Sequence, residues 1–202
     1  MKKIFVLLIG LILLPLCAQA SVFKEGVNYK VVKPMATTQP EVMEFFSYYC
    51  PHCYTFEPFM MDLNKSLGKN VKFEQNHVDF LGGAMGAELT RGLGAAQLLG
   101  VEDEFTALVF KTLHVQRQQI NGEKGIVAIF AKLNISQSKA KGALDSFSAA
   151  GLASQMKRNT EIFKIQGVPT IIVNGQYQVM TGSVKNGNEL TDLVKYLLKK
   201  KN

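Results

Sequence analysis

Cysteine is scarce in this sequence, and several other signals are missing from it. The 202-residue chain has three cysteines, and a chain of this length buries a hydrophobic core without disulfide staples. It shows no internal repeat, and its 47% hydrophobic and 19% charged residues are ordinary for a globular protein, not for a disordered or collagen-like one. The basic-aromatic pattern of nucleic-acid-binding modules is also missing, so nucleic acid is not expected as a partner.

The first 20 residues have the pattern of a secretory signal peptide. Lys2 and Lys3 supply the positive start, and residues 4–16 form an apolar run. Ala18-Gln19-Ala20 then offers a cleavage site with small residues. The apolar run is shorter than the roughly 20 residues needed to span a bilayer, which disfavours an uncleaved anchor. Residues 1–20 are therefore predicted to be a signal peptide, and the mature protein is expected to be exported.

Export changes the meaning of the cysteines. Cys17 leaves with the signal peptide, and Leu16 argues against a lipoprotein because that signal has a small residue before its cysteine. The mature chain keeps Cys50 and Cys53 in an oxidising compartment. Two cysteines separated by two residues close almost no loop, so their bond would add little stability. A pair that is poor as a staple and well placed for redox chemistry points to catalysis.

The hydrophobic pattern predicts strands first, then helices, then strands again. A helix begins at Cys50-Pro51 after a strand, contains Pro58 and ends near Gly68. The turn signal Asn174-Gly175 joins two later strands into a hairpin. The expected strands cover residues 27–32 (an edge strand), 41–47 (a central strand), 71–80 (an inner strand), 170–173 and 177–180, and the further helices cover 87–99, 102–115, 125–133, 137–147, 152–165 and 189–199.

The helical block is too long to be a loop inside a compact fold. A helical domain inserted into an α/β domain is the simplest arrangement that accommodates it. We therefore expect residues 21–83 and 166–202 to form one α/β domain and residues 84–165 to form an inserted all-helical domain.

A Cys-x-x-Cys pair can also belong to a haem or zinc site. Haem attachment would need a histidine directly after Cys53, where the chain has Tyr54. A structural zinc site needs about four ligands. Beyond the two cysteines the mature chain offers only three histidines, and His52 between the cysteines is awkwardly placed to ligate the same ion. No metal is therefore expected.

Helix electrostatics assign different roles to the two cysteines. Cys50 stands at a helix N-terminus, where unpaired backbone N–H groups and the helix dipole favour a thiolate. Cys53 lies one turn further in and is expected to be more buried, which suits a resolving thiol. His52 adds a positive charge when protonated and an N–H donor when neutral. Because a stabilised thiolate stabilises the reduced enzyme, the Cys50–Cys53 disulfide should pass readily to a substrate.

The sequence resembles the DsbA family of periplasmic disulfide donors in the thioredoxin superfamily. The resemblance rests on Glu44-Phe45-Phe46-Ser47, Cys50-Pro51-His52-Cys53-Tyr54, His77-Val78, Gly100-Val101-Glu102-Asp103 and Gly167-Val168-Pro169. It implies a thioredoxin fold with an inserted helical domain, a mixed disulfide formed at Cys50 and resolved by Cys53, and no cofactor. It also implies a periplasmic location, unfolded or reduced exported proteins as substrates, and reoxidation by a DsbB-type membrane quinone reductase. An unusually acidic cysteine and an oxidising couple are known properties of this family, so the electrostatic argument agrees with them and does not establish them independently.

The resemblance also assigns roles outside the cysteine motif. Pro169 matches the cis-proline of the family, which would place the Val168 backbone beside the disulfide to pair with an extended substrate. Glu44 matches an acid that moves the proton of Cys53, although a solvated carboxylate on an edge strand is the alternative. The family has lysine where this chain has Gln75, so Glu44 is not expected to be half of a charged pair.

Other residues near the motif have plainer explanations. His77 and His114 are expected to be structural, because isolated histidines usually satisfy local hydrogen bonds. Tyr48, Tyr49 and Phe56 are candidates for an apolar substrate platform, although packing alone would explain them.

Two rival functions remain open. A disulfide isomerase or reductase of the same fold is the first. Periplasmic isomerases usually carry an N-terminal dimerisation module, and residues 21–39 are too short for one, which disfavours this alternative. The protein is expected to be a monomer. A metal-binding or chaperone module without turnover is the second.

Overall fold

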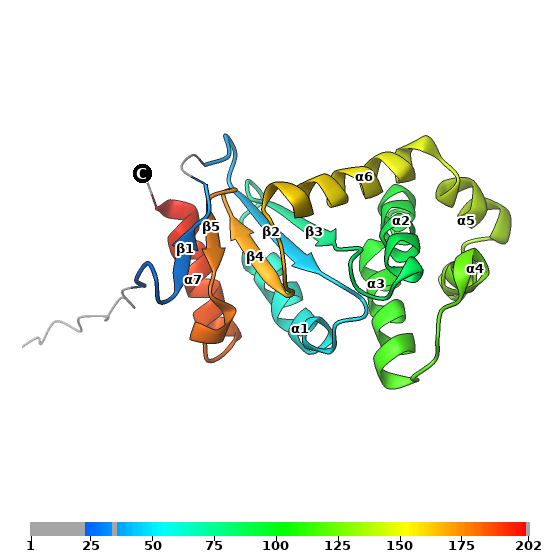
Figure 1. Ribbon diagram of the computed structural model, residues 1–202, viewed down its shortest axis with the longest axis horizontal. Helices are drawn as coiled ribbons and strands as arrows, with labels where there is room; N and C mark the ends of the chain where they lie inside the picture. Colours follow the sequence, from blue (N-terminus) through cyan, green and yellow to red (C-terminus); the bar gives the residue numbers. More distant parts are fainter. Residues whose placement is uncertain (1–22, 34–35, 201–202) are drawn as a thin grey trace, which may run out of the picture.

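The computed structural model describes residues 23–33 and 36–200, and the predicted signal peptide lies outside them. The predicted order of strands and helices is confirmed (Figure 1). The elements are β1 (Tyr29–Val31), β2 (Glu41–Phe46), α1 (Pro51–Ser66), β3 (Lys72–His77), α2 (Ala84–Leu99), α3 (Glu102–Phe110), a π-helical turn (Lys111–Val115), α4 (Gly122–Lys132), α5 (Gln137–Leu144), α6 (Phe147–Ile162), β4 (Thr170–Val173), β5 (Tyr177–Val179), a 3₁₀ turn (Thr181–Ser183) and α7 (Gly187–Lys199).

The described strands form one mixed sheet in the order β1-β5-β4-β2-β3. β2 runs parallel to β3 and antiparallel to β4, and β4 and β5 form the predicted hairpin. Asn174 and Gly175 in its turn both have positive φ, which these two residue types tolerate well. The prediction that β3 is an inner strand is wrong, because β3 lies at the sheet edge. Its buried end is covered by α6, whose Met156 carbonyl accepts a hydrogen bond from Asn76 at 3.1 Å.

Helices α1 and α7 cover one face of the sheet. Leu190, Leu193, Val194 and Leu197 recur at helical spacing and give α7 an apolar stripe. This stripe packs with Met60 and Leu63 of α1 and with apolar residues of the sheet. Because side chains alternate along a strand, Glu44 lies on the same face of β2 as Val42, which belongs to this cluster.

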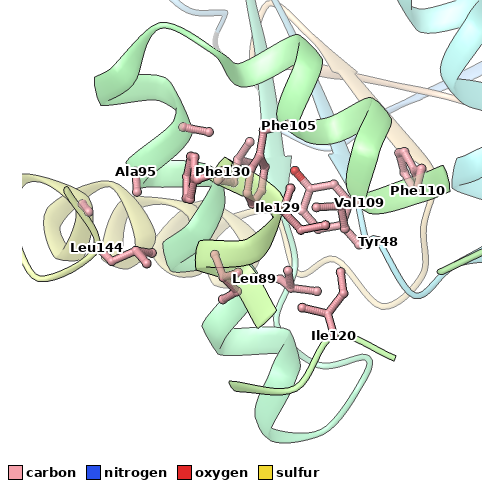
Figure 2. Packing of buried hydrophobic residues seen from close by; sticks show 14 of the residues in the cluster. Tyr48, Leu89, Ala95, Phe105, Val109, Phe110, Ile120, Ile129, Phe130 and Leu144 are labelled. Carbon is pink, nitrogen blue, oxygen red and sulfur yellow. The ribbon is translucent and has the colours of Figure 1, made fainter. Parts of the chain in front are cut away.

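Helices α2 to α6 gather beside the sheet and share a second core (Figure 1). Phe105 and Phe130 stack at its centre with ring centroids 4.8 Å apart. Figure 2 shows that Tyr48, from the loop after β2, enters this core, where its ring contacts those of Phe105 and Phe110. The division into an α/β domain and an inserted helical domain at residues 84–165 stays a prediction.

This arrangement brings the loop after β2, the start of α1 and residues 165–169 together at one place. The C-terminal end of β2 leads into the loop before α1, and α6 runs back toward the sheet and leads into residues 165–169 (Figure 1). Cys50 and Cys53 belong to the apolar cluster of the helical block. None of the helices in the described part of the chain combines the length and the hydropathy that crossing a bilayer requires.

Candidate active site

Cys50 is the N-cap residue of α1, as predicted. The chain turns after β2, with the Cys50 N–H donating to the Ser47 carbonyl at 3.0 Å. Pro51 follows in the first helical turn, where its missing N–H is not needed. The Cys50 Sγ accepts a hydrogen bond from the backbone N–H of Cys53 at 3.4 Å. The first turn of α1 contains no acid in its sequence, so no carboxylate of that turn offsets the N–H groups and the helix dipole near this sulfur.

Cys53 is buried more deeply than Cys50, also as predicted. Its exposed fraction is 0%, against 8% for Cys50, and both are free thiols. Burial raises the pKa of the Cys53 thiol, and the charges of Cys50 and Glu44 raise it further. An approaching sulfur can therefore reach Cys50, while Cys53 is held protonated inside the protein when it is reduced.

The loop before β4 lies against Cys50. The Val168–Pro169 peptide bond is cis, which confirms the expected isomer. The Cys50 thiol donates to the Val168 carbonyl with 3.5 Å between sulfur and oxygen, although the two residues are 118 positions apart. Thr170 Oγ1 donates to the Gly167 carbonyl at 2.8 Å and ties the loop to the start of β4. The structure thus brings Val168 and Pro169 together with the cysteines.

His52 lies in the first turn of α1 with its side chain exposed. It lines a hollow of about 410 Å³ together with Val168 and Pro169. The histidine therefore borders the same hollow as Val168, whose carbonyl contacts Cys50.

Glu44 is fully buried beneath α1. The interior position of β2 and an exposed fraction of 0% rule out the solvated edge residue that the sequence left open. Its Oε2 accepts a hydrogen bond from Gln75 Nε2 at 2.9 Å, and its Oε1 finds no hydrogen-bond partner among the described residues. Burial raises the pKa of Glu44 to about 8, and the charge of Glu57 contributes. This carboxyl therefore holds a proton at neutral pH.

Glu57 is a residue of this site that the sequence analysis missed. Gln75 Nε2 also donates to Glu57 Oε2, at 3.3 Å, so that one amide bridges two carboxyl groups. Burial raises the pKa of Glu57 to about 7. Glu57 also lines a small hollow of about 70 Å³ with Asp103. The sequence spacing could have identified Glu57, because this residue stands four positions after Cys53 and so lies on the same face of the helix.

Two histidines hold the loop before Cys50. His77 Nε2 accepts from the Tyr48 N–H at 3.1 Å, and its Nδ1 lies 2.7 Å from Thr90 Oγ1. Burial lowers the pKa of His77 to about 3, so the ring is neutral. Because Nε2 accepts a hydrogen bond, the ring proton is on Nδ1, which donates it to Thr90 Oγ1. His114 Nε2 donates to the Tyr48 carbonyl at 2.8 Å, and its ring stacks on Tyr54. Both histidines are structural, as predicted.

The aromatic residues around the motif are mainly packed. Tyr48 is completely buried, and its hydroxyl forms a hydrogen bond with Thr106 Oγ1 at 2.9 Å. It is therefore not part of a substrate platform. Phe56 packs in the core between the sheet and α7. Tyr49 is partly exposed, and a Cβ on Gly82 would lie 2.2 Å from its ring. Tyr49 and Phe56 are both partly exposed, so these two candidates still border the surface, whereas Tyr48 does not.

Among the described residues, no three His, Cys, Asp or Glu side chains are grouped as ligands of one metal ion would be.

Comparison with known proteins agrees with this geometry. Residues 41–198 match the family model of the DSBA-like thioredoxin domain. The chain is 37% identical over 213 aligned residues to the thiol:disulfide interchange protein DsbA of Pectobacterium carotovorum, with both chains fully covered. The crystal structure of the disulfide oxidoreductase DsbA from Proteus mirabilis superposes with a TM-score of 0.80 at 32% identity, covering 89% of this chain and 98% of that one. A Proteus mirabilis DsbA variant in complex with the non-covalently bound peptide PWATCDS gives a TM-score of 0.81 at 30% identity, covering 89% and 100%. The predicted fold class, an α/β thioredoxin fold with an inserted all-helical domain, is confirmed.

Proposed function

This chain belongs to the DSBA-like thioredoxin domain family and is a protein disulfide oxidoreductase, and we propose that it works as an oxidase that donates its Cys50–Cys53 disulfide to newly exported proteins. The observation that carries this proposal is the asymmetry of the two sulfurs. Cys50 Sγ receives a backbone N–H at the start of α1 and borders the surface, whereas Cys53 is buried and its pKa is raised. A thiolate favoured at Cys50 stabilises the reduced enzyme, and the disulfide is then readily given away.

The reaction consists of two exchange steps. A substrate thiolate attacks the Cys50 sulfur of the disulfide, and the bond between Cys50 and Cys53 breaks, with the electron pair leaving on Cys53. The resulting mixed disulfide joins Cys50 to the substrate. A second substrate thiolate then attacks the substrate sulfur and releases Cys50 as a thiolate. The substrate dithiol is oxidised by two electrons, and the enzyme disulfide is reduced to a dithiol.

Glu44 supplies the proton that the first step requires. The Cys53 sulfur leaves as an anion inside the protein, where burial strongly favours the neutral thiol. Glu44 is protonated at neutral pH, and it lies close enough to Cys53 that its charge, once it is ionised, raises the pKa of that thiol. It therefore acts as a general acid in the oxidising direction and as a general base in the reverse direction. Glu57, linked to Glu44 through Gln75 and partly exposed, connects this acid to the solvent side of α1.

Val168 and Pro169 hold the substrate. The cis bond leaves the Val168 backbone facing Cys50, where an extended substrate segment could add main-chain hydrogen bonds. The Proteus mirabilis relative with a non-covalently bound peptide supports peptide binding by this chain. His52 borders the same space and adds positive charge to the thiolate when it is protonated.

The predicted signal peptide supports export, and the family supports a periplasmic location for this reaction, in an oxidising compartment. Each turnover leaves the enzyme reduced, so a renewable oxidant must restore its disulfide. A DsbB-type membrane quinone reductase fits that need, and the family supports it. The protein is expected to act as a monomer without a cofactor.

The reduction potential measured against glutathione tests the proposal. We expect a couple clearly more oxidising than that of thioredoxin, which lies at about −270 mV. A value as reducing as that of thioredoxin would overturn the donor function. Refolding of a scrambled multi-disulfide protein separates the alternative, because fast reshuffling without an added oxidant would favour an isomerase or reductase. A binding module would be favoured by two results together. The reduced protein would take up metal tightly and stoichiometrically, and the Cys50→Ala variant would assist the folding of a substrate protein as well as the parent does.

A further inference from the structure

Two hollows meet at the cis-proline. One has a volume of about 410 Å³ and includes His52 and Val168, and the other has a volume of about 390 Å³ and includes Val27 and Met180. Both are lined by Pro169, Thr170, Gln178 and Thr181. The two hollows therefore adjoin, and Val168, which lines one of them, contacts Cys50; together we call them the cis-proline groove.

The charges along this groove have one sign. Lys30, on the edge strand β1, and Lys164, in the turn after α6, line its first half together with His52. Both lysines are exposed, and within the described chain neither forms an ion pair. The described residues that line the two hollows include no aspartate or glutamate.

The acids near α1 lie away from this groove. Glu57 and Asp103 line a hollow with Met61 and Phe73, and Glu74 and Glu102 line another beside β3. Neither of these hollows includes His52 or any residue of the cis-proline groove. Lys65 lines the first of these hollows and Lys72 the second, so both carry mixed charge, whereas the charged residues that line the cis-proline groove are all positive.

From the positive lining of the groove we infer that it selects extended polypeptide segments that carry aspartate or glutamate beside the reacting cysteine, with Lys30 and Lys164 as the specificity-determining residues. The inference rests on the proposed function and deepens it by naming a class of substrate. A carboxylate beside the cysteine would meet two unpaired ammonium groups, whereas a lysine there would meet two like charges. Because these groups are exposed, the attraction is moderate and is screened by salt.

Three dithiol peptides test the inference. They share one sequence and differ at the two positions that flank the first cysteine, which are both Asp, both Asn or both Lys. The rate at which each peptide reduces the oxidised enzyme is followed by mass spectrometry of quenched samples at low and at high ionic strength. We expect the Asp peptide to react about three- to tenfold faster than the Asn peptide at low salt, and the Lys peptide to be slowest. High salt should reduce the differences in rate among the three peptides.

Two double variants locate the effect. Lys30→Gln with Lys164→Gln should abolish the ranking of the three peptides. Lys139→Gln with Lys195→Gln makes the same change in net charge at exposed lysines outside the groove and should preserve it. Equal rates for the three peptides at low salt would overturn the inference while leaving the oxidase function intact. Loss of the ranking in the control variant would overturn it too, and failure of every peptide to react would overturn both proposals.

Discussion

Replacing Glu44 with glutamine should remove a pH dependence of stability whose size follows from the burial of this carboxyl. Its ordinary pKa is 4.5, and burial raises the pKa to about 8 in the folded protein. The folded state therefore holds the proton more tightly than the unfolded chain does. This contribution to stability is complete in acid and is lost as the pH rises from about 4.5 to about 8.

The magnitude is large compared with the total stability of a domain. One pH unit within this window is worth ~1.4 kcal/mol. Ionisation of Glu44 should therefore reduce the free energy of unfolding by about 4 kcal/mol between pH 5 and pH 9. Domains of this size are commonly stable by about 5–15 kcal/mol, so the loss is easily measured. Glu57 adds a dependence of the same sign, because burial raises its pKa to about 7.

Urea unfolding of the reduced protein at pH 5, 7 and 9 measures this effect. We expect the free energy of unfolding of Glu44→Gln to rise relative to that of the parent as the pH increases, by about 4 kcal/mol between pH 5 and pH 9. Titrating groups remote from Glu44 contribute equally to both proteins and cancel in the difference, and the double variant Glu44→Gln/Glu57→Gln compared with Glu57→Gln removes the contribution of the coupled Glu57. Glu161→Gln, at an exposed position on α6, serves as the matched control and should follow the parent. Parallel curves for the parent and Glu44→Gln would refute the reasoning, since Glu44 would then ionise in the folded protein as easily as in water.

Three further predictions concern the redox chemistry. Cys53→Ala should accumulate a mixed disulfide with oxidised glutathione because the resolving thiol is gone, and mass spectrometry should find no such adduct on Cys50→Ala. The reduced protein should melt at a higher temperature than the oxidised one, because the disulfide opposes a favoured thiolate, and equal melting temperatures in calorimetry would contradict a donor couple. Gln75→Lys should lower the pKa of both Glu44 and Glu57 by placing an ammonium group between two carboxylates. The decline of the oxidation rate with rising pH should then move to lower pH, and an unchanged pH profile would show that Glu44 does not supply the proton.

The local pattern of the sequence was enough to predict the chemistry of the cysteine motif. A strand followed by Cys-Pro-His-Cys and a helical pattern places Cys50 at a helix N-terminus, and the structure confirms that position. The turn at Asn174-Gly175 was equally local. These features depend on neighbours in the chain, which a single sequence displays directly.

Features that depend on packing between distant segments were predicted less well. The apolar pattern of β3 indicated an inner strand, yet its burial comes from α6, which packs against it across the sheet edge. Tyr48 follows a strand near the motif, and its aromatic ring could equally face solvent or a core. Only the docking of the helical block decides that it is buried. The bridge from Gln75 to Glu44 and Glu57 joins three elements, so the sequence showed its members without showing that they meet.

Helix α1 separates two requirements that disulfide transfer must satisfy together. The sulfur that meets the substrate must be open to a large and variable polypeptide, whereas the sulfur that leaves must exchange a proton in a place that water does not reach freely. Cys50 and His52 lie at the start of the helix, beside a groove lined by lysines. Cys53 is buried in the same turn, and its neighbour Glu44 is bridged to a partly exposed acid on the same helix. Because the two sulfurs are one turn apart, a single disulfide joins these two environments. The residues of the groove can therefore change without affecting Glu44, and the proton supply to Cys53 can change without affecting the groove.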